Sequence, residues 1–345
     1  MNRTQKTLAL VDDPLFCEHL APAGHPERPE RLHAARAAIA RAELDLRRVD
    51  LATRAATNDE LSRVHAQQYL HQLDQLAGRS GYLDEDTFYS AASVDAARAG
   101  AGAALVITDA LLDRRADFGL ALVRPPGHHA RPNTAMGFCL LNNVAAAAAH
   151  ARARGVERVA IVDFDVHHGN GTQEIFYADP NVLYVSLHQS PLYPGTGATS
   201  ERGIADGHGY TVNVPLSAGA DDAVYAAAVE RIVAPVLAAY QPGLLLFSAG
   251  FDAHARDPLA QMAMSDNGFR ALVRRSLAAL EPGVGVGLML EGGYDLQGLG
   301  ESLAAVLEGL GEGPQHEIPA SRLWEAHERD LNAATAAAAE LWKLS

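Results

Sequence analysis

The segment Val162–Asn170 places reactive side chains just where an apolar run ends. Asp163, Asp165 and His167 occupy alternate positions along it. Because residues two apart in a β-strand point to the same face, these side chains should converge at the end of the strand. Aspartate oxygen and histidine nitrogen are ordinary ligands of Zn²⁺. The segment therefore predicts a metal site, with metal-dependent hydrolysis as the first hypothesis.

Other apolar runs also end in polar side chains. His128 and His129 follow one run, Asp252 follows a second, and Tyr294 follows a third. In open α/β sheets the ligand site lies beyond the carboxyl ends of the strands, so we expect these side chains to meet. Each motif alone could be a turn, a helix cap or a polar loop. Their joint occurrence at equivalent strand ends favours a single active site.

The elements that must position these residues follow from the hydrophobic pattern. Short apolar runs separated by alanine-rich helical segments predict an α/β fold, with a parallel sheet covered by helices on both faces. The chain 1–345 is expected to form a single domain, with a motif-bearing core at about 20–310 and a C-terminal helix within 320–345 that packs on the outside. The expected strands are 8–11, 118–123, 158–164, 182–187, 210–214, 244–248 and 285–290, and the expected helices include 93–114, 142–154, 223–240 and 266–279.

Composition restricts the partners and the compartment. The net charge of −14 argues against a nucleic-acid partner. The apolar runs fall short of the roughly 18 residues of a membrane span. Two cysteines and an N-terminus without a secretory signal indicate a cytoplasmic protein. Whether the chain forms a homo-oligomer stays open.

The residue types are suited to amide hydrolysis at one metal ion. Zn²⁺ on Asp165, His167 and Asp252 would keep open positions for a water molecule and a substrate carbonyl. Two aspartates weaken the Lewis acidity of the metal, so a separate general base is useful. Either of the adjacent histidines that follow the run 118–123 could serve as this base.

Further polar residues would complete such a site. A hydroxyl donor opposite the metal, Tyr294, would stabilise the tetrahedral oxyanion. Asp163 and Asn170 would hold the two imidazoles through their other ring nitrogens and set their tautomers.

The order of motifs resembles that of the histone deacetylase family, and the likeness extends from His25 to about residue 310. Asn170, where many class I members carry aspartate, is similar to the class II and bacterial deacetylase-like amidohydrolase branch. The motifs are Arg124-Pro-Pro-Gly-His-His, Gly137-Phe-Cys-Leu-Leu-Asn-Asn, Asp163-Phe-Asp-Val-His-His-Gly-Asn-Gly, Pro194-Gly-Thr-Gly, Tyr210-Thr-Val-Asn-Val-Pro, Ser248-Ala-Gly-Phe-Asp and Glu291-Gly-Gly-Tyr.

This resemblance implies an arginase–deacetylase fold around an eight-stranded, mostly parallel sheet, and one catalytic Zn²⁺ on the three ligands named above. It implies that His129 is the general base and acid, paired with Asn170. His128 would be its electrostatic partner, paired with Asp163. Tyr294 would polarise the substrate carbonyl, and its presence favours an active enzyme.

The resemblance also implies structural K⁺ and a substrate tunnel. Arg31 corresponds to an arginine that lines an internal acetate-release channel. Asp84 or Asp86 would supply a carboxylate at the rim of the tunnel. One K⁺ would be held by Asp163, Asp165, His167, Ser186 and Leu187, and a second by backbone oxygens of Phe176, Asp179, Val182 and Tyr210. The tunnel would be lined by Gly137, Phe138, Tyr193, Leu259 and Gly293.

The tunnel residues favour an acylated lysine or a similar amine as the substrate. Leu259 occupies a rim position where polyamine-selective relatives carry glutamate, and leucine cannot attract a distal ammonium group. Tyr193 stands where phenylalanine is usual. The alternatives are an acetylpolyamine amidohydrolase, a dinuclear manganese ureohydrolase and a non-catalytic acyl-lysine-binding protein. The pair Asp252 and His254 lacks the Asp-x-Asp of dinuclear sites, and intact Tyr294 argues against a non-catalytic protein.

Overall fold

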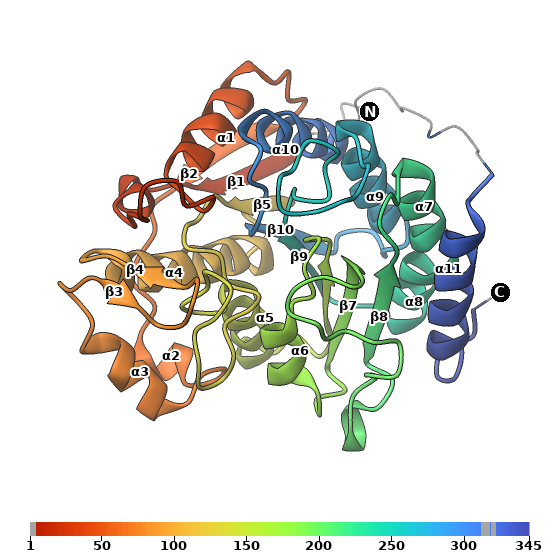
Figure 1. Cartoon of the computed structure of the whole chain (residues 1–345), viewed down its shortest axis with the longest axis horizontal. Helices are drawn as coiled ribbons and strands as arrows, with labels where there is room; N and C mark the ends of the chain where they lie inside the picture. The colour runs from red at the N-terminus through yellow and green to blue at the C-terminus, as the bar shows by residue number, and fades with distance from the viewer. Residues whose placement is uncertain (1–4, 312–317, 319–321, 345) are drawn as a thin grey trace.

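The computed structural model describes residues 5–311, 318 and 322–344. Its centre is an eight-stranded sheet (Figure 1) in which all paired strands are parallel. The predicted α/β architecture is therefore confirmed. The strands, in sheet order, are β2 (Arg47–Leu51), β1 (Thr7–Val11), β5 (Phe118–Ala121), β10 (Gly285–Leu290), β9 (Leu244–Ala249), β6 (Val159–Asp163), β7 (Val182–Gln189) and β8 (Thr211–Leu216).

The central strands are buried on both faces, which explains their continuous apolar sequences. Every residue of β6 and of β9 is buried. Helices cover both faces of the sheet (Figure 1), so neither face needs the alternation of polar and apolar residues seen in half-exposed strands. Because all the strands run the same way, the loops after β5, β6, β9 and β10 leave the same edge of the sheet. These are the loops that carry the predicted site.

Two groups of helices form the outer layers. On one face α4 and α5 pack against each other, with α4 on β1, β5 and β10 and α5 on β6 and β9. On the other face α10 packs between α1 and α9. The helices are α1 (Glu30–Arg41), α2 (Asn58–Leu61), α3 (Gln67–Asp74), α4 (Ser93–Leu112), α5 (Asn143–Ala153), α6 (Asn170–Phe176), α7 (Asp222–Ala228), α8 (Ala234–Tyr240), α9 (Asp266–Ala278), α10 (Leu296–Leu310) and α11 (Glu325–Ala338), with short 3₁₀ turns at Pro14–Cys17 and Ala205–Gly207.

The structure departs from the sequence-based expectation in a few elements. The segment expected as one helix over 223–240 is α7 and α8 joined by a π-helical turn at Val229–Val233. The expected outer helix is α11, which packs against β8. The edge strand β2 was not expected, and neither was the small hairpin of β3 (Gly81–Tyr82) and β4 (Phe88–Tyr89).

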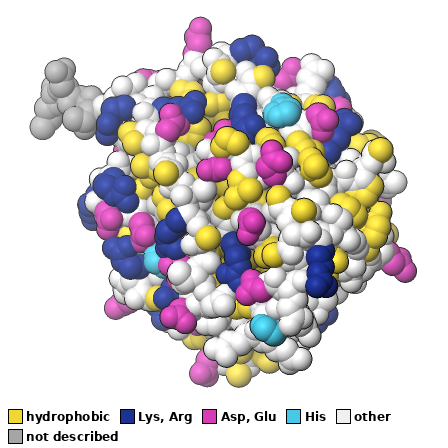
Figure 2. Space-filling view, turned by 90° about the vertical axis from the view of Figure 1, so that its left-hand side faces the viewer, with side chains coloured by type: hydrophobic (Ala, Val, Ile, Leu, Met, Phe, Trp, Pro, Cys, Tyr) yellow, Lys and Arg dark blue, Asp and Glu magenta, His cyan; other side chains and the backbone are white. Residues whose placement is uncertain are grey.

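By length and composition alone, one helical segment could span a membrane, namely Asp222–Tyr240 with a mean hydropathy of 1.4. This segment packs against α9 and α11, and 56% of its most apolar stretch is buried. Contacts within the fold therefore account for its apolar character. On the face shown in Figure 2, basic and acidic side chains are interspersed with hydrophobic ones.

Candidate active site

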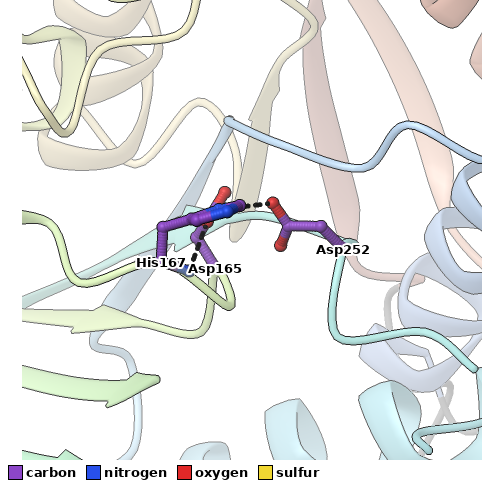
Figure 3. Close-up of side chains that lie close together, drawn as sticks. All are labelled: Asp165, His167 and Asp252. Atoms are coloured by element: carbon purple, nitrogen blue, oxygen red, sulfur yellow. Dashed lines mark hydrogen bonds and ion pairs between the residues drawn. The ribbon is translucent and has the colours of Figure 1, made fainter. Parts of the chain in front are cut away.

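The predicted metal ligands lie together at the carboxyl edge of the sheet. Asp165 and His167 are on the loop after β6, and Asp252 is on the loop after β9, the neighbouring strand. One ligand atom from each lies within 4.8 Å of the other two. In Figure 3 the ring of His167 points towards both carboxylates, with Nδ1 at 3.1 Å from Asp165 and 3.2 Å from Asp252. Within the described residues, this is the one His, Cys, Asp and Glu group with such spacing.

The donor set fits a zinc ion. One imidazole nitrogen and two carboxylate oxygens are ordinary zinc ligands, and all three side chains are buried. Burial, followed by the negative charge of Asp165, raises the pKa of Asp252 to about 7. Two buried carboxylates this close are costly unless a cation neutralises them. A divalent cation would remove this cost.

Backbone amides orient the two carboxylates. The amide of His167 donates to Asp165 at 2.9 Å, and the amide of Gly292 donates to the other oxygen of Asp165 at 2.8 Å. The amide of Val166 donates to Asp252 at 2.8 Å. A Cβ atom on Gly292 would lie 2.1 Å from the Asp252 carboxylate, so only glycine fits beside the ligands. The first glycine of the motif after β10 thus leaves space for the two carboxylates.

The adjacent histidines after β5 have different partners. His128 Nδ1 lies 3.0 Å from Asp163, and His129 Nδ1 lies 2.8 Å from the side-chain oxygen of Asn170. Both pairs are the ones that the resemblance implied. The hydroxyl of Tyr184 also donates to Asp163, at 3.0 Å, a contact that the sequence did not indicate.

The two imidazoles differ in their electrostatic surroundings. Burial disfavours the charged form of His128, but the carboxylates of Asp163 and Asp165 raise its pKa to about 10. Burial also lowers the pKa of His129, and the nearby His128 and His167 lower it well below the usual value. His129 is therefore held neutral and can accept a proton, whereas His128 is held cationic.

Tyr294 is on the loop after β10. Its side chain is buried against the ring of Phe138, with the ring centroids 5.9 Å apart. Burial is the main cause that raises the pKa of Tyr294 well above its usual value, so the hydroxyl stays protonated as a hydrogen-bond donor. The Asp257 carboxylate accepts from the amide of Tyr294 at 2.6 Å and from the amide of Leu259 at 2.9 Å. The sequence analysis did not single out Asp257, because Asp257 followed by proline is typical of an ordinary turn.

A cavity of about 250 Å³ leads to these groups. Four of the predicted tunnel residues line it, and Asp86 is the rim carboxylate that reaches it. Asp84 instead accepts from the amides of Asp86 and Thr87 within its own turn. Gly293 does not appear among the described residues that line this cavity. The lining residues are Asp86, His129, Gly137, Phe138, His167, Leu192, Tyr193, Leu259 and Tyr294.

Phe138 is held in place by unusual backbone geometry. Its φ of 67° lies in the left-handed region, which is strained for a bulky residue. The preceding Gly137 also has a positive φ, and a Cβ there would lie 2.4 Å from the ring of His129. The ring of Phe138 makes an edge contact with His25 at 4.7 Å. This strained turn sets the aromatic wall of the cavity directly beside His129.

The remaining predicted residues are Arg31 and those of the two expected K⁺ sites. Arg31 is fully buried, and its guanidinium lies 5.0 Å from the centre of the Tyr294 ring. Its Nε donates to the carbonyl of Gly293 at 2.7 Å. The first expected K⁺ site involves the end of β6 and the interior of β7, and the second involves the end of α6 and the starts of β7 and β8; K⁺ itself stays a prediction. The hydroxyl of Ser186 lies 2.9 Å from His188 Nδ1, and the carbonyls of Phe176, Asp179 and Tyr210 accept backbone hydrogen bonds.

Comparisons with known proteins identify the family of this chain. The family described as "Histone deacetylase domain" matches residues 25–310. A probable deacetylase of Archaeoglobus fulgidus is 38% identical over 82% of this chain and 80% of its own length. A histone deacetylase-like amidohydrolase of Pseudomonas aeruginosa is 41% identical over 79% of this chain and 73% of its own. Histone deacetylase 15 of Arabidopsis thaliana is 42% identical over 86% of this chain, and the match spans only 54% of that relative.

A solved structure shows the same fold. The crystal structure of the HDA15 HD domain superimposes with a TM-score of 0.91 at 36% identity, covering 99% of this chain and 96% of that one. The fold and site thus define a protein of the deacetylase and amidohydrolase class. The chain belongs to the histone deacetylase family. Enzymes of this family act on acetylated substrates.

Proposed function

We propose that this chain is a zinc-dependent deacetylase that removes acetyl or related short acyl groups from an N-ε-acyl-lysine type of substrate. The observation that carries the proposal is the cavity, which joins an aromatic entrance to His129, His167 and Tyr294. An extended aliphatic chain in this cavity would place its terminal amide among a general base, a metal ligand and a hydroxyl donor.

Asp165, His167 and Asp252 would hold the zinc ion. When bound, zinc acts as a Lewis acid towards the carbonyl and lowers the pKa of water, which makes water a better nucleophile. The chain's own residues supply the proton transfers and the hydrogen bonds.

His129 is the residue suited to general base catalysis. Its pKa is lowered by burial and by the neighbouring cationic His128, so the ring is neutral and can accept the proton of the attacking water. Asn170 holds its Nδ1 at 2.8 Å, which leaves Nε2 free to exchange the proton. The same nitrogen then returns the proton to the leaving amine.

His128 and Tyr294 would stabilise the transition state and would not take the proton of the water. His128 is held cationic by Asp163 and Asp165, and its positive charge stabilises the negative charge that develops on the reacting amide. The hydroxyl of Tyr294 would donate to the carbonyl oxygen as it becomes an oxyanion.

The test of this function is a kinetic panel on the zinc-loaded protein. It compares an acetyl-lysine peptide, longer acyl-lysines, trifluoroacetyl-lysine and acetylated polyamines. We expect acetate release from the acetyl-lysine peptide, with kcat/KM above that for acetylputrescine. Binding of the peptide without release of acetate would support the non-catalytic alternative and overturn the proposal.

The side chain at position 259 provides a sharper test of substrate class. Leu259 lines the cavity and offers no charge to a distal ammonium group. Leu259→Glu should raise kcat/KM for acetylputrescine by about tenfold, because a charge pair near the surface supplies about 1 to 4 kcal/mol and a tenfold change needs about 1.4 kcal/mol. Leu259→Gln is the matched control, because it has the same size without the charge. An equal gain in both variants would show that charge does not select the substrate.

A further inference from the structure

Glu27, in the motif His25-Pro-Glu-Arg-Pro-Glu-Arg31, is a buried carboxylate to which the proposed mechanism gives no role. Its carboxylate is fully buried, as are the guanidiniums of Arg31 and Arg124 on either side of it. One oxygen accepts from Arg31 Nη1 at 3.0 Å and from Arg124 Nε. The other accepts from Arg124 Nη2 at 2.7 Å and lies 3.3 Å from His19 Nε2. A single buried carboxylate thus joins two buried guanidiniums.

The two arginines are linked to different loops of the reaction site. Arg124 follows β5 and begins the loop that carries His128 and His129. Its remaining donors bind the carbonyls of Phe16 and His19 at 3.0 Å, so the guanidinium is fixed on every side.

Arg31 holds the loop after β10. Besides Glu27, it donates to the carbonyls of Glu291 and Gly293, which flank the glycine next to the metal ligands. Its guanidinium also lies beneath the ring of Tyr294, 5.0 Å from the centroid. The position of Arg31 therefore sets the position of the Tyr294 loop.

Electrostatics keeps this junction ionised. Burial opposes ionisation of Glu27, but the charge of Arg124 and hydrogen bonds from His19 and Arg124 hold its pKa well below the usual value. Charge-assisted hydrogen bonds to a buried carboxylate are strong and directional. Removing the carboxylate would leave the buried charges of the two guanidiniums unpaired.

We propose that Glu27 is a positioning residue that fixes the general base loop and the Tyr294 loop relative to each other. The inference rests on the proposed function, because it assigns roles to His129 and Tyr294. β5 and β10 are adjacent in the sheet, yet their backbone pairing ends at Ala121 and Met289, before either loop begins. Beyond that point two buried side-chain connections join the loops. The Glu291 carboxylate accepts from the amides of Gly127 and His128 at 2.6 and 3.1 Å, and the chain of Arg124, Glu27 and Arg31 is the second connection.

The test uses Glu27→Asp and Glu27→Gln in the zinc-loaded chain. Aspartate keeps the charge but withdraws the carboxylate by about 1.5 Å. Glutamine keeps the shape but removes the charge. Because a misplacement of about 1 Å can cost on the order of 10²-fold in rate, kcat should fall by about 10- to 100-fold while KM changes little. Glu308→Gln is the control, since it breaks the 2.6 Å ion pair with Arg270 between the outer helices α9 and α10.

A double-mutant cycle separates positioning from general loss of structure. If Glu27 acts through Tyr294, the loss of kcat caused by Glu27→Asp should largely disappear in the Tyr294→Phe background. An undiminished loss in that background, or wild-type kcat in both folded Glu27 variants, would overturn the proposal. If Glu27→Gln does not fold, the milder aspartate variant decides the question.

A second readout does not require activity. Hydrogen exchange measured by mass spectrometry should show faster exchange at 291–295 in Glu27→Asp and unchanged exchange there in Glu308→Gln. Unchanged exchange in Glu27→Asp would contradict the positioning role. A wild-type protein that releases no acetate would instead refute the proposed function, and the hydrogen-exchange result would still show whether Glu27 holds the loop at 291–295.

Discussion

Tyr294→Phe should lower kcat by about 10²–10³-fold, the usual cost of removing one oxyanion donor. The substitution deletes only the hydroxyl, and the phenyl ring can keep its contacts with Phe138 and with the guanidinium of Arg31. Tyr294 is not among the three residues that could hold the metal, so the zinc content should stay unchanged. The measurement is steady-state kinetics on an acetyl-lysine peptide, with zinc determined by elemental analysis.

Two results would contradict this role for Tyr294. Wild-type turnover in Tyr294→Phe would show that another group stabilises the oxyanion. Loss of zinc together with turnover would show that the residue supports the metal site instead. Tyr82→Phe is a suitable control, because it removes a hydroxyl from an exposed tyrosine of the β3–β4 hairpin.

His129→Ala should abolish more activity than His128→Ala. A positioned general base contributes about 10²–10⁴-fold, and His129 is the ring whose surroundings keep it neutral. His128 is held cationic between Asp163 and Asp165, so its loss removes a favourable charge but not the proton acceptor. Kinetics of both variants at equal zinc loading provide the comparison.

The reverse order would exchange the two roles. Asn170→Ala supplies an independent check, because Asn170 contacts His129 and not His128. Asn170→Ala should reduce kcat because Asn170 holds His129, and it should cause little further loss when combined with His129→Ala. Additive losses in that pair would mean that Asn170 does not act through the imidazole.

Much of the site could be predicted because its residues follow apolar strands. β6 and β9 are buried on both faces, so their sequences are apolar without interruption and their ends are easily located. In a parallel sheet these ends share one edge, which brings Asp165, His167 and Asp252 together although 85 residues separate His167 from Asp252. The two strands must also be neighbours in the sheet, as β6 and β9 are, and the apolar pattern alone does not indicate that pairing.

Other features lacked such a signal. The strand β2 has the sequence Arg-Arg-Val-Asp-Leu with largely exposed side chains, as an edge strand can, and so it shows no apolar run. Glu27 and Asp257 act through partners 97 and 37 residues away, and local spacing does not indicate such contacts. The sequence could not show whether Asp84 or Asp86 reaches the cavity. The structure shows that the Asp84 carboxylate instead accepts hydrogen bonds from backbone amides of its own turn.

Zinc-dependent deacetylation is tested most directly by a zinc titration of the metal-free chain, with bound metal and acetate release followed together. We expect one zinc ion per chain, turnover that rises in proportion to bound zinc, and no binding at this site in Asp252→Ala. Full turnover in chelator-treated protein that contains no metal would contradict the proposed zinc chemistry, as would two catalytic ions per chain.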